Sequence, residues 1–261
     1  MVLFARQAGA AIALLLALAA AIPRSSAAQE GAKAEVIVAA AANLTDVFRT
    51  LGPRFEAETG IHPTFNFAST AQLTQQIENA APFDLLAAAD QAHVVELDGK
   101  KLLTPGSRAV YAEGVLALWR PPLSRAEIKG MSDLTSPGVR VIAIAKPELA
   151  PYGQAAVTAL QRAGIWDRVK AKVVYAENIN MARQYGVSGN ADAVFTAYAL
   201  VLREPGVIRV DPKLHDPILQ ELGIVAASPH QAEARRFADF LLKGSGAAIL
   251  AGFGYRVPGK R

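Results

Sequence analysis

The sequence contains no cysteine and only four histidines among its 261 residues. Without cysteine the chain can form no disulfide bond, carry no lipid-anchored cysteine and offer no thiolate ligand to zinc. None of the histidines stands in HExxH, HxH or a similar ligand spacing, so we expect each to be a surface or loop residue rather than a metal ligand. They are His62, His93, His215 and His230.

The motifs of several common enzyme classes are also missing. No GxSxG, GxGxxG or Walker-type loop occurs, and the nearest match, Gly244-Ser245-Gly246, lacks the lysine that a phosphate loop needs. Paired carboxylates such as Glu56 and Glu58 fall on a solvated helix face. A catalytic function therefore has little support, and we expect a protein that is not an enzyme.

Charged residues are scarce as well. They make up 19 % of the chain, and the formal net charge is +4. No cluster of lysine and arginine of the kind that binds nucleic acid is present, and the pair Lys100-Lys101 is typical of a solvated surface. We expect no nucleic-acid partner.

Residues 1–28 show the three-part pattern of a secretory signal peptide. Arg6 precedes an apolar run over residues 8–22, and small residues stand before an expected cleavage after Ala28. The alternative is a membrane anchor, but the charge-free span 7–23 is shorter than the roughly 20 residues that cross a bilayer. No later apolar run reaches that length, and no paired arginine marks the twin-arginine route. We expect an exported, soluble protein of a bacterial periplasm.

Strand and helix patterns alternate along the rest of the chain. The order predicts a two-lobed α/β fold, in which each lobe is a mostly parallel sheet flanked by helices. Pro53 interrupts the first helical pattern, because it cannot donate to the Arg49 carbonyl, and predicts a kink or a new start there. The expected strands cover residues 35–41, 62–68, 83–88, 139–145, 172–175, 191–195 and 207–210.

Two long extended stretches, 110–119 and 218–227, are interpreted as crossings between the lobes. We therefore expect lobe I to comprise residues 29–114 and 226–261 and lobe II to comprise residues 115–225, with a ligand cleft between them.

At four places a short segment, uncharged apart from Glu177, leads from a strand into the start of a helix. The first N–H groups of a helix have no intrahelical acceptor and carry partial positive charge, so such ends bind anions. Each segment alone would be an ordinary N-cap, but two lie in each half of the chain. In an open α/β sheet they face the crevice at the carboxyl ends of the strands, which predicts one anion-binding cleft. The segments are 42–45, 68–71, 150–153 and 177–180.

Five stretches together resemble the molybdate-binding component of bacterial ABC importers, the ModA family. The resemblance runs from Glu35 to Tyr255 and implies a two-lobed periplasmic binding protein of the second structural type. Such proteins close on a dehydrated tetrahedral oxyanion and present it to an ABC transporter permease in the inner membrane. The stretches are VAAAANLTDVF (38–48), FNFASTAQLTQQIENAAPFDLLAAAD (65–90), AIAKPELAPYGQAAVTAL (143–160), YAENINMA (175–182) and GNADAVFTA (189–197).

The resemblance also implies which residues bind the oxyanion. In lobe I they are Asn43, Ser69 and Thr70, and in lobe II they are Tyr152 and Ile179 through their backbone N–H groups. Molybdenum or tungsten would be present only within the oxyanion, with no direct bond to the protein and no cofactor.

The chain departs from the family at one position. Some members add a tyrosine hydroxyl after the strand that matches residues 191–195, where this chain has Thr196, with Tyr198 two residues on. Either side chain could supply the hydroxyl.

A site made only of N–H and O–H donors suits a fully ionised dianion such as molybdate, tungstate or sulfate. Hydrogen phosphate carries a proton that such a site leaves unpaired, at a cost of about 1–3 kcal/mol. Discrimination against sulfate must come from cavity size, because its pattern of acceptors is the same.

We therefore expect a monomeric periplasmic solute-binding protein for molybdate, and also for tungstate. One alternative is the same fold binding a sulfate-like anion or a small organic acid, which the departure at Thr196 suggests. Another alternative is an enzyme on this fold, such as a hydrolase or a deaminase. A ligand-sensing domain of a regulator is excluded by the leader and by the absence of a DNA-binding segment.

Overall fold

The computed structural model describes residues 34–259, which belong to one compact unit. The expected signal peptide, residues 1–28, lies outside the described residues. Within residues 34–259, no helix combines the length and the apolar character that crossing a membrane requires.

The first sheet has the strand order β2-β1-β3-β10-β4. Strand β1 pairs in parallel with β2 and β3, while β10 pairs antiparallel with β3 and β4. Its strands are β1 (Glu35–Ala41), β2 (His62–Ala68), β3 (Leu85–Ala87), β4 (Ala109–Gly114) and β10 (Ile218–Ile224).

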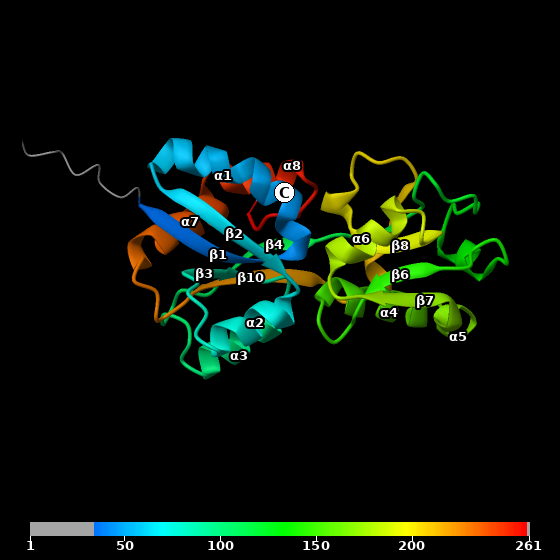
Figure 1. Ribbon diagram of the computed structural model, residues 1–261, viewed down its shortest axis with the longest axis horizontal. Helices are drawn as coiled ribbons and strands as arrows, with labels where there is room; N and C mark the ends of the chain where they lie inside the picture. Colours follow the sequence, from blue (N-terminus) through cyan, green and yellow to red (C-terminus); the bar gives the residue numbers. More distant parts are fainter. Residues whose placement is uncertain (1–33, 260–261) are drawn as a thin grey trace, which may run out of the picture. The chain divides into compact units, whose positions relative to one another are not determined.

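Helices cover both faces of this sheet (Figure 1). One face packs against α1 (Thr45–Thr59), α7 (Gln231–Lys243) and α8 (Ser245–Gly252), and the other against α2 (Thr70–Glu78) and α3 (Ala92–Gly99). The alternation of β1 explains this, because Val38 and Ala40 pack into the core under α1 and α7, whereas Ala39 packs under α2 and α3.

The second sheet repeats this arrangement with the order β7-β6-β8-β5-β9. Strand β6 is parallel to β7 and β8, and β5 is antiparallel to β8 and β9. Its strands are β5 (Leu116–Trp119), β6 (Ile142–Ala145), β7 (Val173–Ala176), β8 (Ala193–Ala197) and β9 (Val207–Arg209). The helices packed around it are α4 (Pro151–Arg162), α5 (Trp166–Val169) and α6 (Ile179–Val187).

Short 3-10 helices complete the described chain. One of them, η1, continues directly from β1 into α1 and places three buried residues at the carboxyl end of that strand. They are η1 (Ala42–Leu44), η2 (Met131–Thr135), η3 (Lys170–Lys172), η4 (Tyr198–Leu200) and η5 (Pro212–Leu214).

The two-lobed α/β fold is confirmed, but the sheets are mixed rather than mostly parallel. The chain passes from the first sheet to the second between Gly114 and Leu116, and returns between Arg209 and Ile218. The expected return boundary at 225/226 is too late, because β10 pairs with β3 and β4 of the first sheet. Pro53 lies inside α1, so this helix does not start anew there.

Aromatic rings fix α1 and α7 against the first sheet. The ring of Phe237 lies 5.0 Å from that of Phe55 and 5.8 Å from that of Phe48, and Phe48 lies 5.1 Å from Phe65 of β2. All three helical rings are fully buried. This packing holds the first turn of α1, and η1 before it, at the carboxyl end of β1.

In the second lobe, a glycine allows α4 to begin close to the end of β6. A Cβ atom at Gly153 would lie 2.1 Å from the carbonyl oxygen of Ala145 and 2.8 Å from its carbonyl carbon. Since these neighbours are backbone atoms, no rotamer change can relieve such a contact.

We predict that Gly153→Ala lowers the free energy of unfolding by about 1–3 kcal/mol, the usual cost of overpacking. The matched control is Gly99→Ala, because a Cβ at Gly99 meets nothing within 4 Å. Urea unfolding followed by tryptophan fluorescence measures both variants. Equal midpoints for the two would contradict the role assigned to Gly153.

Candidate functional site

One pocket lies where the starts of four helices meet. It is small, and none of the residues lining it is charged. The first lobe contributes the end of β1, the starts of η1 and α2 and Ala89 after β3, and the second lobe contributes the starts of α4 and α6. The lining residues are Ala41, Ala42, Asn43, Ser69, Thr70, Ala89, Ala150, Pro151, Tyr152, Asn178 and Ile179.

The sequence of each helix start determines which N–H groups remain unpaired. Asn178 caps α6, and its side-chain oxygen accepts from the N–H groups of Asn180 and Met181, both at 3.0 Å. This leaves the N–H of Ile179 at the pocket. Pro151 is the first residue of α4 and has no N–H, so the first N–H of that helix belongs to Tyr152.

The N–H groups of Asn43, Thr70, Tyr152 and Ile179 are each in the first turn of a helix, where no intrahelical acceptor exists. No other acceptor for them is found among residues 34–259. The pocket therefore brings together N–H donors from both lobes without a neighbouring cation.

The hydroxyl of Thr70 adds a side-chain donor. Its oxygen accepts the N–H of Ala89 at 3.1 Å, so its own proton is left for another acceptor. The hydroxyl of Ser69 instead donates to Oε1 of Gln72 at 2.8 Å. Of this pair, Thr70 is the residue whose hydroxyl is available to the pocket.

The side-chain amide of Asn43 is already engaged. Its Nδ2 donates to Oε1 of Gln220 at 3.1 Å and to the hydroxyl oxygen of Tyr255 at 3.0 Å. Both amide hydrogens are used, so Asn43 offers the pocket its backbone N–H and not its side-chain amide. The partners stand far along the chain, on β10 and after α8, where no local pattern could reveal them.

The structure places both Thr196 and Tyr198 outside the pocket lining. Thr196 is fully buried in β8, and its hydroxyl has no hydrogen-bond partner among the described residues. The ring of Tyr198 lies under the guanidinium of Arg209, 4.2 Å from it. Neither side chain therefore contributes its hydroxyl to the pocket in this conformation.

Several contacts join the lobes around the pocket. The N–H of Ala71 donates to the carbonyl oxygen of Leu149 at 3.2 Å, and Nε2 of Gln72 donates to Oε2 of Glu177 at 3.2 Å. Two further pairs are Asn180 with Thr45 at 2.9 Å and Arg183 with Asp46 at 3.6 Å. The described conformation is therefore closed, and Thr70 and Tyr152 are each only 1 % exposed.

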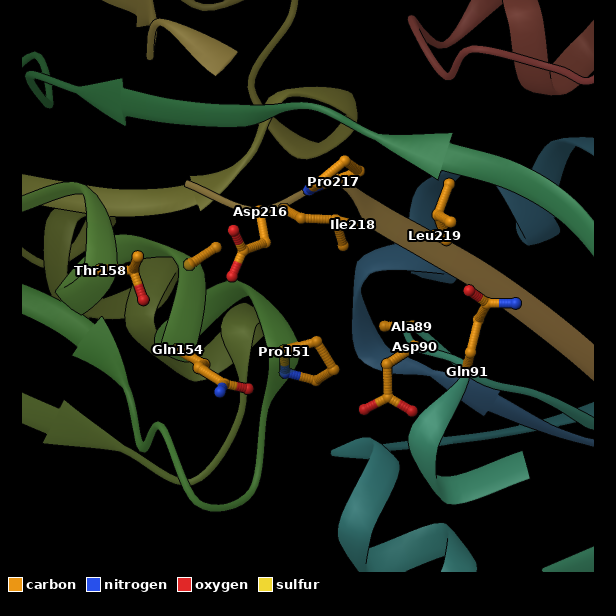
Figure 2. A pocket seen from close by; sticks show the side chains of 11 residues that line it. Ala89, Asp90, Gln91, Pro151, Gln154, Thr158, Asp216, Pro217, Ile218 and Leu219 are labelled. Carbon is orange, nitrogen blue, oxygen red and sulfur yellow. The ribbon is translucent and has the colours of Figure 1, made fainter. Parts of the chain in front are cut away.

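A second hollow, of about 650 Å³, lies beside this pocket and has the opposite character. Figure 2 shows the carboxylates of Asp90, after β3, and Asp216, before β10, at its two sides. These negative groups make the hollow unsuited to an anion. Across residues 34–259, no three side chains of His, Asp or Glu gather as metal ligands.

Comparisons with known proteins show the family and the fold of the chain. The model of the bacterial extracellular solute-binding protein family matches residues 36–256. The chain is 32 % identical over 247 residues to the molybdate-binding protein ModA of Rhodobacter capsulatus, with 94 % of each chain covered.

Solved structures show the same similarity. The periplasmic molybdate-binding protein of Azotobacter vinelandii matches with a TM-score of 0.79 and 29 % identity, over 85 % of this chain and 99 % of that one. The sulfate-binding protein SubI of Mycobacterium tuberculosis matches with a TM-score of 0.73, over 87 % of this chain and 88 % of that one. At 16 % identity, the second likeness shows the fold alone.

We predict that Asn178→Ala lowers the free energy of unfolding by about 1 kcal/mol, because two N–H groups of α6 lose their acceptor. Asn190→Ala is the control, since this side chain donates to the Ser188 hydroxyl in an exposed turn beyond the same helix. Its effect should stay within about 0.5 kcal/mol. Chemical denaturation measures both, and an Asn178→Ala variant as stable as the parent protein would disprove the capping role.

Proposed function

The chain belongs to the ModA family of bacterial extracellular solute-binding proteins, and we propose that it binds molybdate in the pocket between its lobes for delivery to an ABC transporter. The observation that carries this proposal is the convergence of unpaired donors from both lobes on a buried pocket without charged residues. The ligand would replace its hydration shell with these donors.

The proposed hydrogen bonds come from four backbone N–H groups and one hydroxyl. The backbone donors are Asn43, Thr70, Tyr152 and Ile179, and the hydroxyl is that of Thr70. Partial positive charge at each helix start stabilises the dianion without a salt bridge. Tungstate has the same charge and tetrahedral shape, so it is proposed as a second ligand.

Selectivity against phosphate follows from protonation. Hydrogen phosphate must donate its proton, and the proposed donor groups offer it no acceptor. The unpaired proton costs about 1–3 kcal/mol, which is about a fivefold to hundredfold loss of affinity. Sulfate carries no proton and presents the same acceptors, so it stays the main alternative ligand, followed by small organic acids.

The proposal includes a cellular role. The family consists of solute-binding proteins, which supports a periplasmic, non-enzymatic monomer without a cofactor. Residues 1–28 would direct export and be removed, and an ABC permease in the inner membrane would receive the anion. Thr196 and Tyr198 are left out of the proposed ligand set, because neither lines the pocket.

Isothermal titration with molybdate, tungstate, sulfate and phosphate tests the ligand. We expect molybdate and tungstate to bind and phosphate to bind at least about fivefold more weakly. Tighter binding of sulfate than of molybdate would favour the alternative ligand. Equal affinity for phosphate and molybdate would refute the role assigned to unpaired donors.

Thr70→Ala tests the hydroxyl. Hydrogen bonds to a charged group contribute about 1.5–3 kcal/mol, so molybdate affinity should fall about tenfold to a hundredfold. Thr70→Ser keeps the hydroxyl and should bind nearly as the parent does. The matched control is Thr74→Ala, one turn further along α2, whose hydroxyl donates to the carbonyl oxygen of Thr70 within the helix. If Thr70→Ala and Thr74→Ala bind molybdate equally well, the Thr70 hydroxyl does not bind the anion.

A further inference from the structure

Behind the pocket lies a buried cluster of neutral polar side chains, which we call the hydroxyl–amide network. Gln220 and the rings of Tyr111 and Tyr152 are at most 1 % exposed, and Asn43 is equally buried. The members come from η1, β4, α4, β10 and the segment after α8. They are Asn43, Tyr111, Tyr152, Gln220 and Tyr255.

Gln220 is the centre of this network. Its Oε1 accepts from Nδ2 of Asn43 at 3.1 Å and from the hydroxyl of Tyr111 at 2.9 Å. Its Nε2 donates to the hydroxyl oxygen of Tyr152 at 3.0 Å. Tyr255 completes the network by donating to the carbonyl oxygen of Asn43 at 2.8 Å. A single side chain thus contacts a pocket residue of each lobe.

The backbone around Gln220 determines the direction of its side chain and the space available to it. The pairing of β10 with β4 shifts register between Gln220 and Glu221, and such irregularities re-aim a side chain. Gly114, the last residue of β4, has no Cβ and so leaves room for the Gln220 amide and the Tyr152 hydroxyl. A Cβ there would lie 2.1 Å from the hydroxyl oxygen of Tyr152 and 2.6 Å from Nε2 of Gln220.

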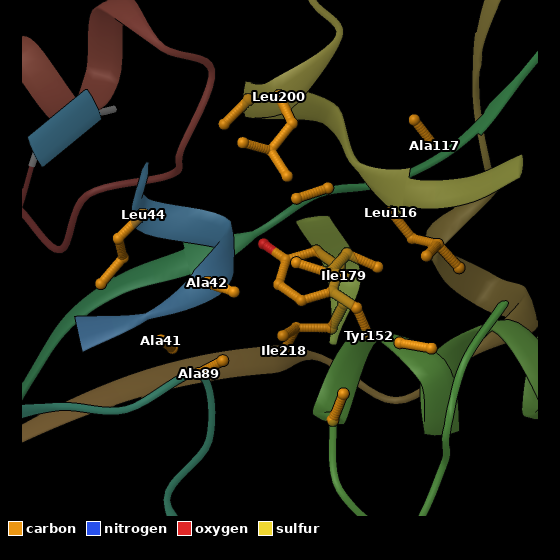
Figure 3. Close-up of a cluster of buried hydrophobic side chains, with 14 of the residues drawn as sticks. Ala41, Ala42, Leu44, Ala89, Leu116, Ala117, Tyr152, Ile179, Leu200 and Ile218 are labelled. Atoms are coloured by element: carbon orange, nitrogen blue, oxygen red, sulfur yellow. The ribbon is translucent and has the colours of Figure 1, made fainter. Parts of the chain in front are cut away.

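Tyr152 is the member of the network that comes from the second lobe. Figure 3 shows its ring among Ala42, Ile179 and Ile218, with the hydroxyl oxygen directed toward the segment that carries Ala42. Burial raises the pKa of Tyr152 well above its usual range, so the hydroxyl stays neutral. Its contact with Gln220 therefore joins the lobes through a neutral hydrogen bond shielded from water.

We propose that Gln220 and the Tyr152 hydroxyl form a latch that holds the lobes closed over the pocket. Gln220 is a positioning residue, because it acts through Asn43 and Tyr152 and does not line the pocket itself. Opening the lobes separates Tyr152 from Gln220, so the bond exists only in the closed state. The latch then lowers the dissociation rate of the anion and leaves its association rate unchanged. This role in release rests on the proposed function, whereas lobe closure itself does not.

Tyr152→Phe removes the hydroxyl and keeps the backbone N–H that faces the pocket. The first measurement is amide hydrogen exchange of Ala71 in the ligand-free protein, because its N–H is bonded across the lobes to Leu149. One neutral hydrogen bond corresponds to about a two- to tenfold change, so we expect exchange at Ala71 to quicken by that factor.

The second measurement is stopped-flow binding with molybdate as the probe. Tyr152→Phe should raise the dissociation rate about two- to tenfold and leave the association rate within about twofold. A merely structural tyrosine would change thermal stability without this division between the two rates.

Tyr111→Phe is the matched control, since it removes another hydroxyl from Gln220 but one that belongs to the first lobe. In the Tyr111→Phe protein, amide exchange at Ala71 and the dissociation rate of molybdate should equal those of the parent. Gly114→Ala is the second test variant, because its Cβ would occupy the place of the Tyr152 hydroxyl. It should quicken exchange at Ala71 as Tyr152→Phe does.

The latch is refuted if folded Tyr152→Phe protein exchanges Ala71 at the parent rate, or if Tyr111→Phe quickens this exchange equally. It is also refuted if Tyr152→Phe slows association instead of hastening dissociation. If the parent protein binds no molybdate, the proposed function fails, and exchange at Ala71 still decides whether the latch exists.

Discussion

The unpaired N–H groups in the first turn of a helix are the constraint on which this structure depends. Helices α2, α4 and α6 and the η1–α1 segment each follow a parallel strand, so their first turns gather at the carboxyl edges of the two sheets. With the lobes facing each other, groups that would normally bind water become buried around one pocket. A bound acceptor satisfies these donors in the closed state, so ligand binding would stabilise that state.

Because unpaired N–H groups supply the donors, the pocket needs no charged side chain in its lining. A cation in the pocket would attract any anion. Fixed N–H and O–H donors instead favour an anion whose oxygens are all unprotonated, because a protonated oxygen would find no acceptor. The network behind the pocket has the same character, because burial raises the pKa of Tyr111, Tyr152 and Tyr255 and keeps their hydroxyls protonated. Ion pairs such as Lys146 with Glu177, at 2.7 Å, lie outside the pocket lining.

The two passages of the chain between the sheets connect the pocket to motion of the lobes. β4 ends at Gly114 and β5 begins at Leu116, so a single residue separates the sheets on the outward passage. Gln220 stands opposite Ala112 on the returning strand β10, next to the register shift. Groups that hold Asn43 and Tyr152 in place therefore lie directly beside the two passages between the lobes.

The sequence by itself determined most of the strands and helices and indicated the class of the site. Short β-branched runs and N-caps place β1 and α6 correctly, and the uncharged helix starts at Asn43, Thr70, Tyr152 and Ile179 indicate an anion pocket. Only the tertiary structure decided that β10 belongs to the first sheet, that the amide of Asn43 bonds Gln220 and Tyr255, and that Thr196 lies outside the pocket. The physical reason is distance along the chain. Caps and strand periodicity are set by neighbours a few residues apart, whereas the partner of a buried amide is set by whichever distant strand packs beside it.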